Sequence, residues 1–250
     1  MSRDSILTVN KLNHYFGEYE LQRQILFDIN LAIQSEEIII LTGPSGAGKT
    51  TLLTLLGGLR SVQAGSIQFL GQELRGATET QRIQMRRQIG FIFQSHNLMP
   101  FLTAKQNVQL SFELFDHVSE QEAEFKAEAM LSAMHLGKYI NYYPQQLSVG
   151  QKQRIAISRA LVISPQLILA DEPTASLDSK TGRDVVELMQ DLAKKQGSAV
   201  LIVTHDHRIL GCANRIMAVE DGHLHEKNLN KGSAPSTADV HLYPFWGKGS

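Results

Sequence analysis

The residues best suited to chemistry in this sequence begin with a glycine-rich segment. It fits the pattern G-x-x-x-x-G-K-[ST], and it lies between the apolar run 38–41 and a helical pattern that begins near Lys49. Such glycines let backbone N–H groups approach phosphate oxygens, and the helix N-terminus adds about half a positive charge. We therefore predict a nucleotide site in the residues Gly43, Pro44, Ser45, Gly46, Ala47, Gly48, Lys49, Thr50 and Thr51. Lys49 would bind the β- and γ-phosphates, and the Thr50 hydroxyl would hold Mg²⁺.

Two carboxylates follow a second apolar run, 167–170, which reads as a buried strand. Asp171 stands where a carboxylate would hold Mg²⁺, directly or through water, and Glu172 would polarise the attacking water as a general base. Paired acids at a strand end commonly form only a solvated turn. Beside a complete phosphate loop, the catalytic interpretation is favoured.

Histidine 205 follows a third apolar run, 200–203, just as Glu172 follows its own strand. This position favours a hydrogen bond from His205 to the γ-phosphate or to the attacking water. A structural, hydrogen-bonded histidine is the alternative.

A second anion site is predicted at the start of a helix, 152–162. Ser148 is a candidate N-cap whose hydroxyl would bond an anion, and Gly150 permits close approach. A simple capped helix is the alternative.

The order of the elements predicts an α/β fold, because strands and helices alternate as in a parallel or mixed sheet. A helix-rich stretch, 95–165, interrupts this order and predicts an inserted helical lobe. Strands are predicted at 6–9, 25–33, 38–41, 67–70, 89–93, 167–170 and 199–204, and further helices at 49–56, 119–134 and 181–195.

Composition narrows the functional class. The chain has 250 residues, 42% of them hydrophobic, and a net charge of −1, which does not favour nucleic acid as a partner. No stretch approaches the roughly 18 to 20 apolar residues that cross a bilayer, and the first residues do not resemble a signal peptide. We expect a cytoplasmic protein that reaches a membrane only through a partner.

Together these segments resemble the nucleotide-binding domain of ATP-binding cassette (ABC) proteins. The segment 147–151 is similar to the signature of that family, Gln94 to its Q-loop glutamine, 176–178 to its D-loop and His205 to its switch histidine. The resemblance implies a P-loop NTPase (RecA-like) core with a β subdomain and an inserted helical subdomain. It spans residues 5–225, and the tail 226–250 is predicted to be flexible.

The same resemblance implies a head-to-tail homodimer that encloses two ATP molecules. Ser148, Gly150 and Gln151 of one chain would close over ATP on the phosphate loop of the other, with Asp178 nearby. Gln94 would act in catalysis and as a metal ligand, and adenine would stack on Tyr15, or less favourably on Phe16. The family most often has glycine where this chain has Val149, which puts the tightness of closure in doubt.

Within the family, the chain most resembles the ATPases of macrolide-efflux and lipoprotein-release systems (MacB/LolD-like). Its nearest likeness is to the DevA-like ATPases of cyanobacterial glycolipid exporters, carried by the segments 13–17, 52–59, 94–104 and 178–186. The likeness implies an exporter motor at the cytoplasmic face of the inner membrane, with a permease, a membrane-fusion adaptor and an outer-membrane channel. An importer ATPase, and less favourably a soluble ABC ATPase, are the alternatives.

Two apolar segments remain to be assigned. Residues 98–102 would form a groove for a cytoplasmic helix of the permease, or else pack inside the helical lobe. The aromatic segment 241–246 would dock on the surface of its own chain, bind a partner or stay disordered.

Overall fold

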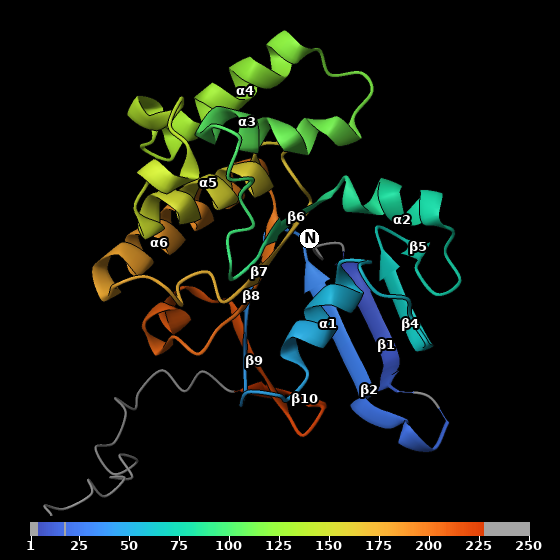
Figure 1. The fold of residues 1–250 in the computed structure, drawn as a ribbon. Helices are drawn as coiled ribbons and strands as arrows, with labels where there is room; N and C mark the ends of the chain where they lie inside the picture. Colours follow the sequence, from blue (N-terminus) through green and yellow to red (C-terminus); the bar gives the residue numbers. More distant parts are fainter. Residues whose placement is uncertain (1–4, 18, 228–250) are drawn as a thin grey trace, which may run out of the picture.

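The computed structural model describes residues 5–17 and 19–227, which form two sheets and a helical lobe (Figure 1). In spatial order, the larger sheet contains β10 (His223–Lys227), β9 (Arg215–Glu220), β3 (Ile38–Thr42), β8 (Ala199–Val203), β7 (Leu167–Asp171) and β6 (Ile89–Ile92). The smaller sheet contains β2 (Arg23–Gln34), β1 (Ser5–Phe16), β4 (Ala64–Phe69) and β5 (Gln72–Glu73).

The central strands of the larger sheet are parallel: β3 pairs with β8 and β9, and β7 pairs with β8 and β6. Every residue of β8 is buried, as are the first four of β7, because helices cover both faces of the sheet. The α1 helix (Lys49–Leu56) lies between the two sheets, while α5 (Val149–Leu161) and α6 (Ser179–Gln196) cover the other face. This arrangement confirms the predicted α/β fold with a β subdomain.

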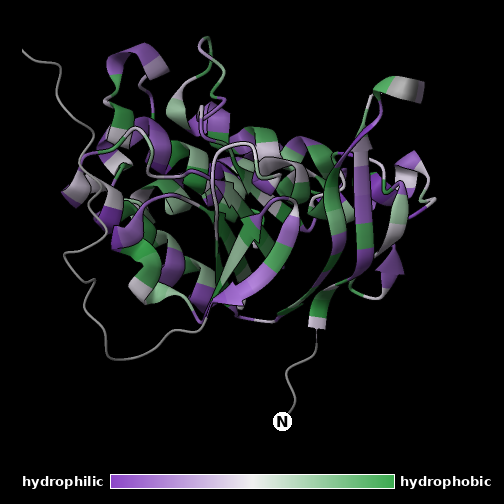
Figure 2. Cartoon of the chain, turned by 90° about the horizontal axis from the view of Figure 1, so that it is seen from below, coloured by the Kyte–Doolittle hydropathy of each residue, from purple (hydrophilic) through white to green (hydrophobic). Residues whose placement is uncertain are grey.

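The hydrophobic core is divided by the larger sheet into two layers. One layer joins the smaller sheet to α1, where Leu52, Leu53, Leu55 and Leu56 are all buried. The other layer packs α5 and α6 against the opposite side chains of β7 and β8. Figure 2 shows the apolar residues concentrated in the interior of the molecule, where sheets and helices face one another, and the polar residues on the outside.

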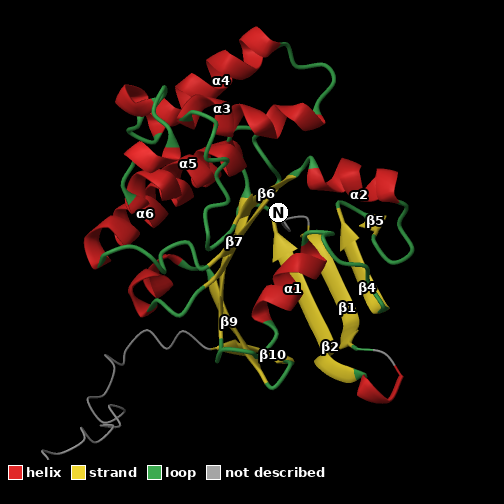
Figure 3. Cartoon of the chain, viewed as in Figure 1, coloured by secondary structure: helices red, strands yellow, loops and turns green. Residues whose placement is uncertain are grey.

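The segment between β6 and β7 forms the predicted helical lobe (Figure 3). The lobe contains α3 (Ala104–Gln109), η2 (Leu110–Leu114), α4 (Glu120–Ala133) and α5, and it has a hydrophobic cluster of its own. The α2 helix (Glu79–Arg86) precedes β6 outside the lobe. No helix within the described part of the chain is both long and apolar enough to span a bilayer.

Several predicted boundaries were wrong. The β1 strand runs to Phe16 instead of ending at residue 9, so Tyr15 and Phe16 belong to a strand instead of a turn. The register shifts between Val9 and Leu12, where Lys11 has φ 43°, and such bulges break the alternation on which the prediction relied. The β9 and β10 strands were not predicted, and β10 extends to Lys227, two residues past the predicted boundary. The rest of the predicted tail, 228–250, lies outside the described residues.

Candidate functional site

The phosphate loop connects β3 to α1, as its sequence pattern requires. Two of its glycines are held in conformations that a side chain would not tolerate. Gly43 has φ 140°, and a Cβ there would lie 2.1 Å from the carbonyl oxygen of Val219. Gly48 is the N-cap of α1 with φ 102°, and a Cβ there would approach Leu26 to 2.8 Å. The loop is therefore packed against β9 and β2, and its shape depends on glycine at both positions.

The Lys49 side chain is buried and curls back along this loop. Its ammonium group donates hydrogen bonds to the carbonyl oxygens of Gly43 and Pro44, each 2.8 Å long. Burial lowers the pKa of Lys49, and the negative charges of Glu172 and Asp171 partly oppose that shift. The positive charge is thus aimed at the loop, where a phosphate anion would compensate its burial.

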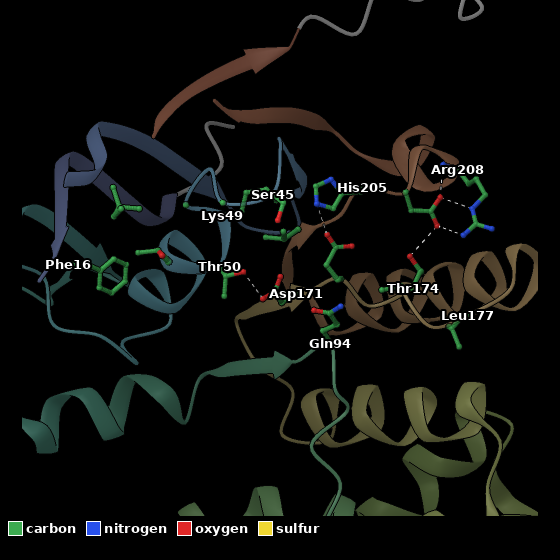
Figure 4. Close-up of a pocket in the computed structure, with 18 residues that line it drawn as sticks. Phe16, Ser45, Lys49, Thr50, Gln94, Asp171, Thr174, Leu177, His205 and Arg208 are labelled. Atoms are coloured by element: carbon green, nitrogen blue, oxygen red, sulfur yellow. Dashed lines mark hydrogen bonds and ion pairs between the residues drawn. The ribbon is translucent and has the colours of Figure 1, made fainter. Parts of the chain in front are cut away.

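A pocket of about 740 Å³ lies in front of the loop and brings together most of the predicted residues (Figure 4). It is lined by the predicted residues Ser45, Gly46, Gly48, Lys49, Thr50, Thr51, Gln94, Asp171, Glu172 and His205. Gly43, Pro44 and Ala47 shape the loop without lining the pocket.

Oxygen atoms meet at one side of this pocket. The Thr50 hydroxyl donates a 3.0 Å hydrogen bond to a carboxylate oxygen of Asp171, although these residues are far apart in the sequence. Gln94, which follows β6, lines the same pocket. Hydroxyl, carboxylate and amide oxygens are the donors that Mg²⁺ prefers, so the donor set fits the predicted metal.

Glu172 and His205 form a close pair at the ends of β7 and β8. The Nε2 atom of His205 lies 3.3 Å from a carboxylate oxygen of Glu172 (Figure 4). The Glu172 N–H donates to the carbonyl oxygen of Val203, and Glu172 has φ 50°, a conformation rarely adopted by residues other than glycine. Strained backbone of this kind concentrates at functional sites. Both side chains line the pocket in front of the phosphate loop.

Sequence reasoning missed a second polar cluster in the pocket. Arg208 donates to both carboxylate oxygens of Asp206, at 2.6 and 2.7 Å, and the Thr174 hydroxyl donates to Asp206 at 3.1 Å. The hydrogen bond from Arg208 is the main reason that the pKa of Asp206 falls to about 2. The cluster ties the segment after β8 to the segment after β7. The sequence signal was the position of Asp206 directly after His205.

Phe16, and not Tyr15, lines the pocket. The Phe16 ring contacts the edge of buried His14, with 5.1 Å between ring centroids, and the guanidinium of Arg60 lies 5.0 Å from its centroid. The register of β1 shifts between Leu12 and Tyr15, so the bulges in this strand decide which of the two aromatic side chains faces the pocket. Of the two predicted aromatic residues, Phe16 therefore lines the pocket in front of the phosphate loop and Tyr15 does not.

The remaining predicted residues do not line this pocket. Ser148 is the N-cap of α5, forms a capping box with Gln151, and lies next to Val149, which is 44% exposed. Asp178 caps α6 by accepting from two backbone N–H groups. Gly150 has a structural role as well: a Cβ there would lie 2.8 Å from the Thr181 methyl group, so glycine permits the packing of α5 on α6.

Comparison with known families identifies this arrangement. A family model described as "ABC transporter" matches residues 26–175, which include the phosphate loop, the segment 147–151 and both carboxylates. The chain belongs to the ABC transporter family. It is an ABC ATPase, and it has the fold of the ATP-binding domain of that family.

Three similar proteins place it within the ABC family. A lipoprotein-releasing system ATP-binding protein, LolD, from Zymomonas mobilis is 39% identical over 91% of this chain and 98% of its own length. A macrolide export ATP-binding/permease protein, MacB, from Marinobacter nauticus is 38% identical over 90% of this chain, which spans only 35% of that protein. The dimeric ATP-binding cassette MJ0796, solved with ADP and phosphate, superposes with a TM-score of 0.82 at 35% identity, covering 89% of this chain and 98% of that one. The chain is thus an ABC transporter ATP-binding domain of the MacB/LolD-like type.

The first prediction concerns Glu172. If its carboxylate accepts a proton from the attacking water, Glu172→Gln lowers kcat for ATP hydrolysis by about 100- to 10,000-fold and leaves ATP binding intact. Phosphate release and nucleotide binding measure the two effects separately. Glu113→Gln, an exposed change in η2, is the control and keeps the normal rate. A normal rate in Glu172→Gln would assign the base to another group.

The second prediction separates Phe16 from Tyr15. Stacking of a base on an aromatic ring is worth about 1–3 kcal/mol, so Phe16→Ala should weaken ATP affinity by about 5- to 100-fold. Tyr15→Ala, in the same strand, should leave the affinity nearly unchanged. Binding of ATP and of inorganic triphosphate, which has no base, is measured for both variants. The reverse order of ATP affinities would restore Tyr15 as the stacking residue.

Proposed function

We propose that this chain is the ATP-hydrolysing motor subunit of a membrane exporter of the macrolide-efflux and lipoprotein-release type. The observation that carries the proposal is the likeness to LolD over almost the full length of both chains, combined with the assembled site. We assign the exporter to the DevA-like branch that serves glycolipids, on the strength of the segments 13–17, 52–59, 94–104 and 178–186. The motor would act at the cytoplasmic face of the inner membrane, bound to a permease that works with an adaptor and an outer-membrane channel.

Two copies of the chain would enclose two ATP molecules head to tail. Ser148, Gly150 and Gln151 lie at the exposed start of α5, outside the pocket of their own chain, and so are available to a nucleotide held by a second copy. Asp178, at the start of α6, would lie near the same interface. The dimeric form of the similar cassette MJ0796 supports this arrangement.

Within each site, the loop residues Gly43–Thr51 would bind the phosphates, and Thr50, Asp171 and Gln94 would hold Mg²⁺. The ion would neutralise charge on the β- and γ-phosphates. Lys49 would add a fixed positive charge, Glu172 would accept the proton of the attacking water, and His205 would orient that water or contact the γ-phosphate. Gln94 stands two residues after the end of β6, where the chain leads into the helical lobe, so it would link the site to the surface of that lobe.

The permease would bind the helical lobe at residues 98–102. Met99 is 43% exposed and Phe101 is 71% exposed, whereas Leu98 packs against the core of the lobe. The exposed side chains of Met99 and Phe101 lie a few residues after Gln94 in the sequence. They are suited to receive an apolar helix from the membrane subunit.

The third prediction tests this contact. Phe101→Asp should leave the ATPase rate of the isolated subunit unchanged and abolish its stimulation by the permease in proteoliposomes. Phe125→Asp is a matched control, because Phe125 is 74% exposed in the same lobe and belongs to α4 instead of the segment 98–102. Loss of nucleotide binding in Phe101→Asp would show that the segment supports the fold instead of the permease.

The fourth prediction tests the exporter assignment. The Glu172→Gln variant, loaded with ATP, should retain a four-span permease and an adaptor from gently solubilised native membranes, identified by mass spectrometry. A permease recovered with a substrate-binding protein would indicate an importer instead. Recovery of soluble partners alone, with the ATP-bound dimer intact, would overturn the transport assignment.

A further inference from the structure

The α4 helix has two apolar faces, and only one of them is covered by the described residues. Ala123, Ala127 and Leu131 are buried in the core of the helical lobe. Phe125, Ala129 and Ala133 follow one another at intervals of four residues, which places them along a second face. All three are exposed, and Phe125 is 74% exposed.

This second face is one wall of a groove with a volume of about 520 Å³. Phe112 and Phe115 form another wall, and Val162, Ile163 and Gln196 close the far side. The groove therefore lies where the lobe meets the end of α6 (Figure 1). Its lining is mostly aromatic and aliphatic, with the polar groups His117, Lys126, Ser164 and Gln196 around it.

The groove is separate from the nucleotide site. Residues 162–164 lead into the amino end of β7, and Gln196 precedes the amino end of β8. The catalytic pair, in contrast, follows the carboxyl ends of the same strands. The two cavities thus lie at opposite ends of the parallel strands of the larger sheet. The proposed ATPase mechanism gives no role to the groove.

We propose that the segment Leu242-Tyr243-Pro244-Phe245-Trp246 of the same chain occupies this groove. These residues belong to the segment after Lys227, and the sequence there offers no other comparable group of apolar side chains. Aromatic side chains bury about 150–250 Å² each and prefer edge-to-face or offset contacts with other rings. Phe115 and Phe125 provide such partners, while the polar groups in the lining suit the tyrosine hydroxyl and the indole N–H.

The direction of the chain favours this placement. The β10 strand is antiparallel to β9. It therefore ends, at Lys227, on the side of the sheet where the parallel strands begin, which is also the side where the groove lies. Neighbouring strands are about 4.8 Å apart, so the four steps from β10 to β7 span roughly 19 Å. The fourteen residues 228–241 reach up to about 45 Å when extended, which exceeds the span to β7, the strand that follows the groove residues 162–164.

A tether of this length also makes docking in the same chain favourable. A linked segment meets its site at an effective concentration in the millimolar range, so a modest intrinsic affinity fills the groove. Pro244 restricts the backbone beside the aromatic rings, which reduces the entropy lost on docking. The docked tail would join the edge of the sheet at β10 to the helical lobe at α4.

The fifth prediction uses Trp246, the single tryptophan of the sequence, as a fluorescent reporter in the full-length chain. In the native protein, Trp246 emission should be blue-shifted and protected from acrylamide relative to the chain in denaturant. Phe125→Asp and Ala133→Glu should each shift the emission to the red and remove the protection. Phe101→Asp is the matched control, with the same substitution at a similarly exposed phenylalanine of the lobe, and keeps both signals. Circular dichroism confirms that each variant is folded.

Each other outcome would overturn the proposal. An emission spectrum of the native chain equal to that in denaturant would show that the tail is undocked. Protection that survives both Phe125→Asp and Ala133→Glu would place the tail on another surface. Protection that is lost on dilution would show that the segment binds a second copy instead of its own chain. Because no readout depends on ATP or a permease, failure here would leave the exporter proposal untouched.

Discussion

The parallel pairing of β3, β8 and β7 is the constraint on which the rest of the structure depends. These strands share one direction, so the segments that follow them all begin at the carboxyl ends of the strands, on one side of the sheet. The phosphate loop, the carboxylates Asp171 and Glu172, and His205 meet there although they lie far apart in the sequence. The hydrogen bond from Thr50 to Asp171 fixes the spacing between two of these segments.

The site also contains backbone conformations that are energetically unfavourable and must be held in place by the surrounding packing. Glu172 adopts a left-handed backbone conformation, and Gly43 lies so close to Val219 that no side chain fits. Such conformations persist only where neighbouring structure determines them. Here the buried strands on both sides and α1 supply that support. The Asp206–Arg208 ion pair adds a polar tie on the same edge.

The other end of the parallel strands, where they begin, lies away from the nucleotide pocket. Among the described residues, none of the predicted catalytic groups lies at this end, which borders a groove between α4 and the end of α6. The exposed Phe125 ring of α4 lines this groove, and β10 runs toward the same end of the sheet. One sheet thus separates the nucleotide pocket from this groove. The helical lobe contacts both regions, through Gln94 on one side and α4 on the other.

The sequence by itself determined the chemistry and the class of fold. The phosphate loop, the carboxylate pair, His205 and the helix cap at Ser148 depend on residue type and local spacing, which a sequence displays directly. Only the tertiary structure decided that Phe16 instead of Tyr15 lines the pocket, because the bulges in β1 set which face each side chain takes. It also decided the Asp206–Arg208–Thr174 cluster and the groove beside α4. Those features arise where separate elements pack together, and no local pattern encodes how distant surfaces meet.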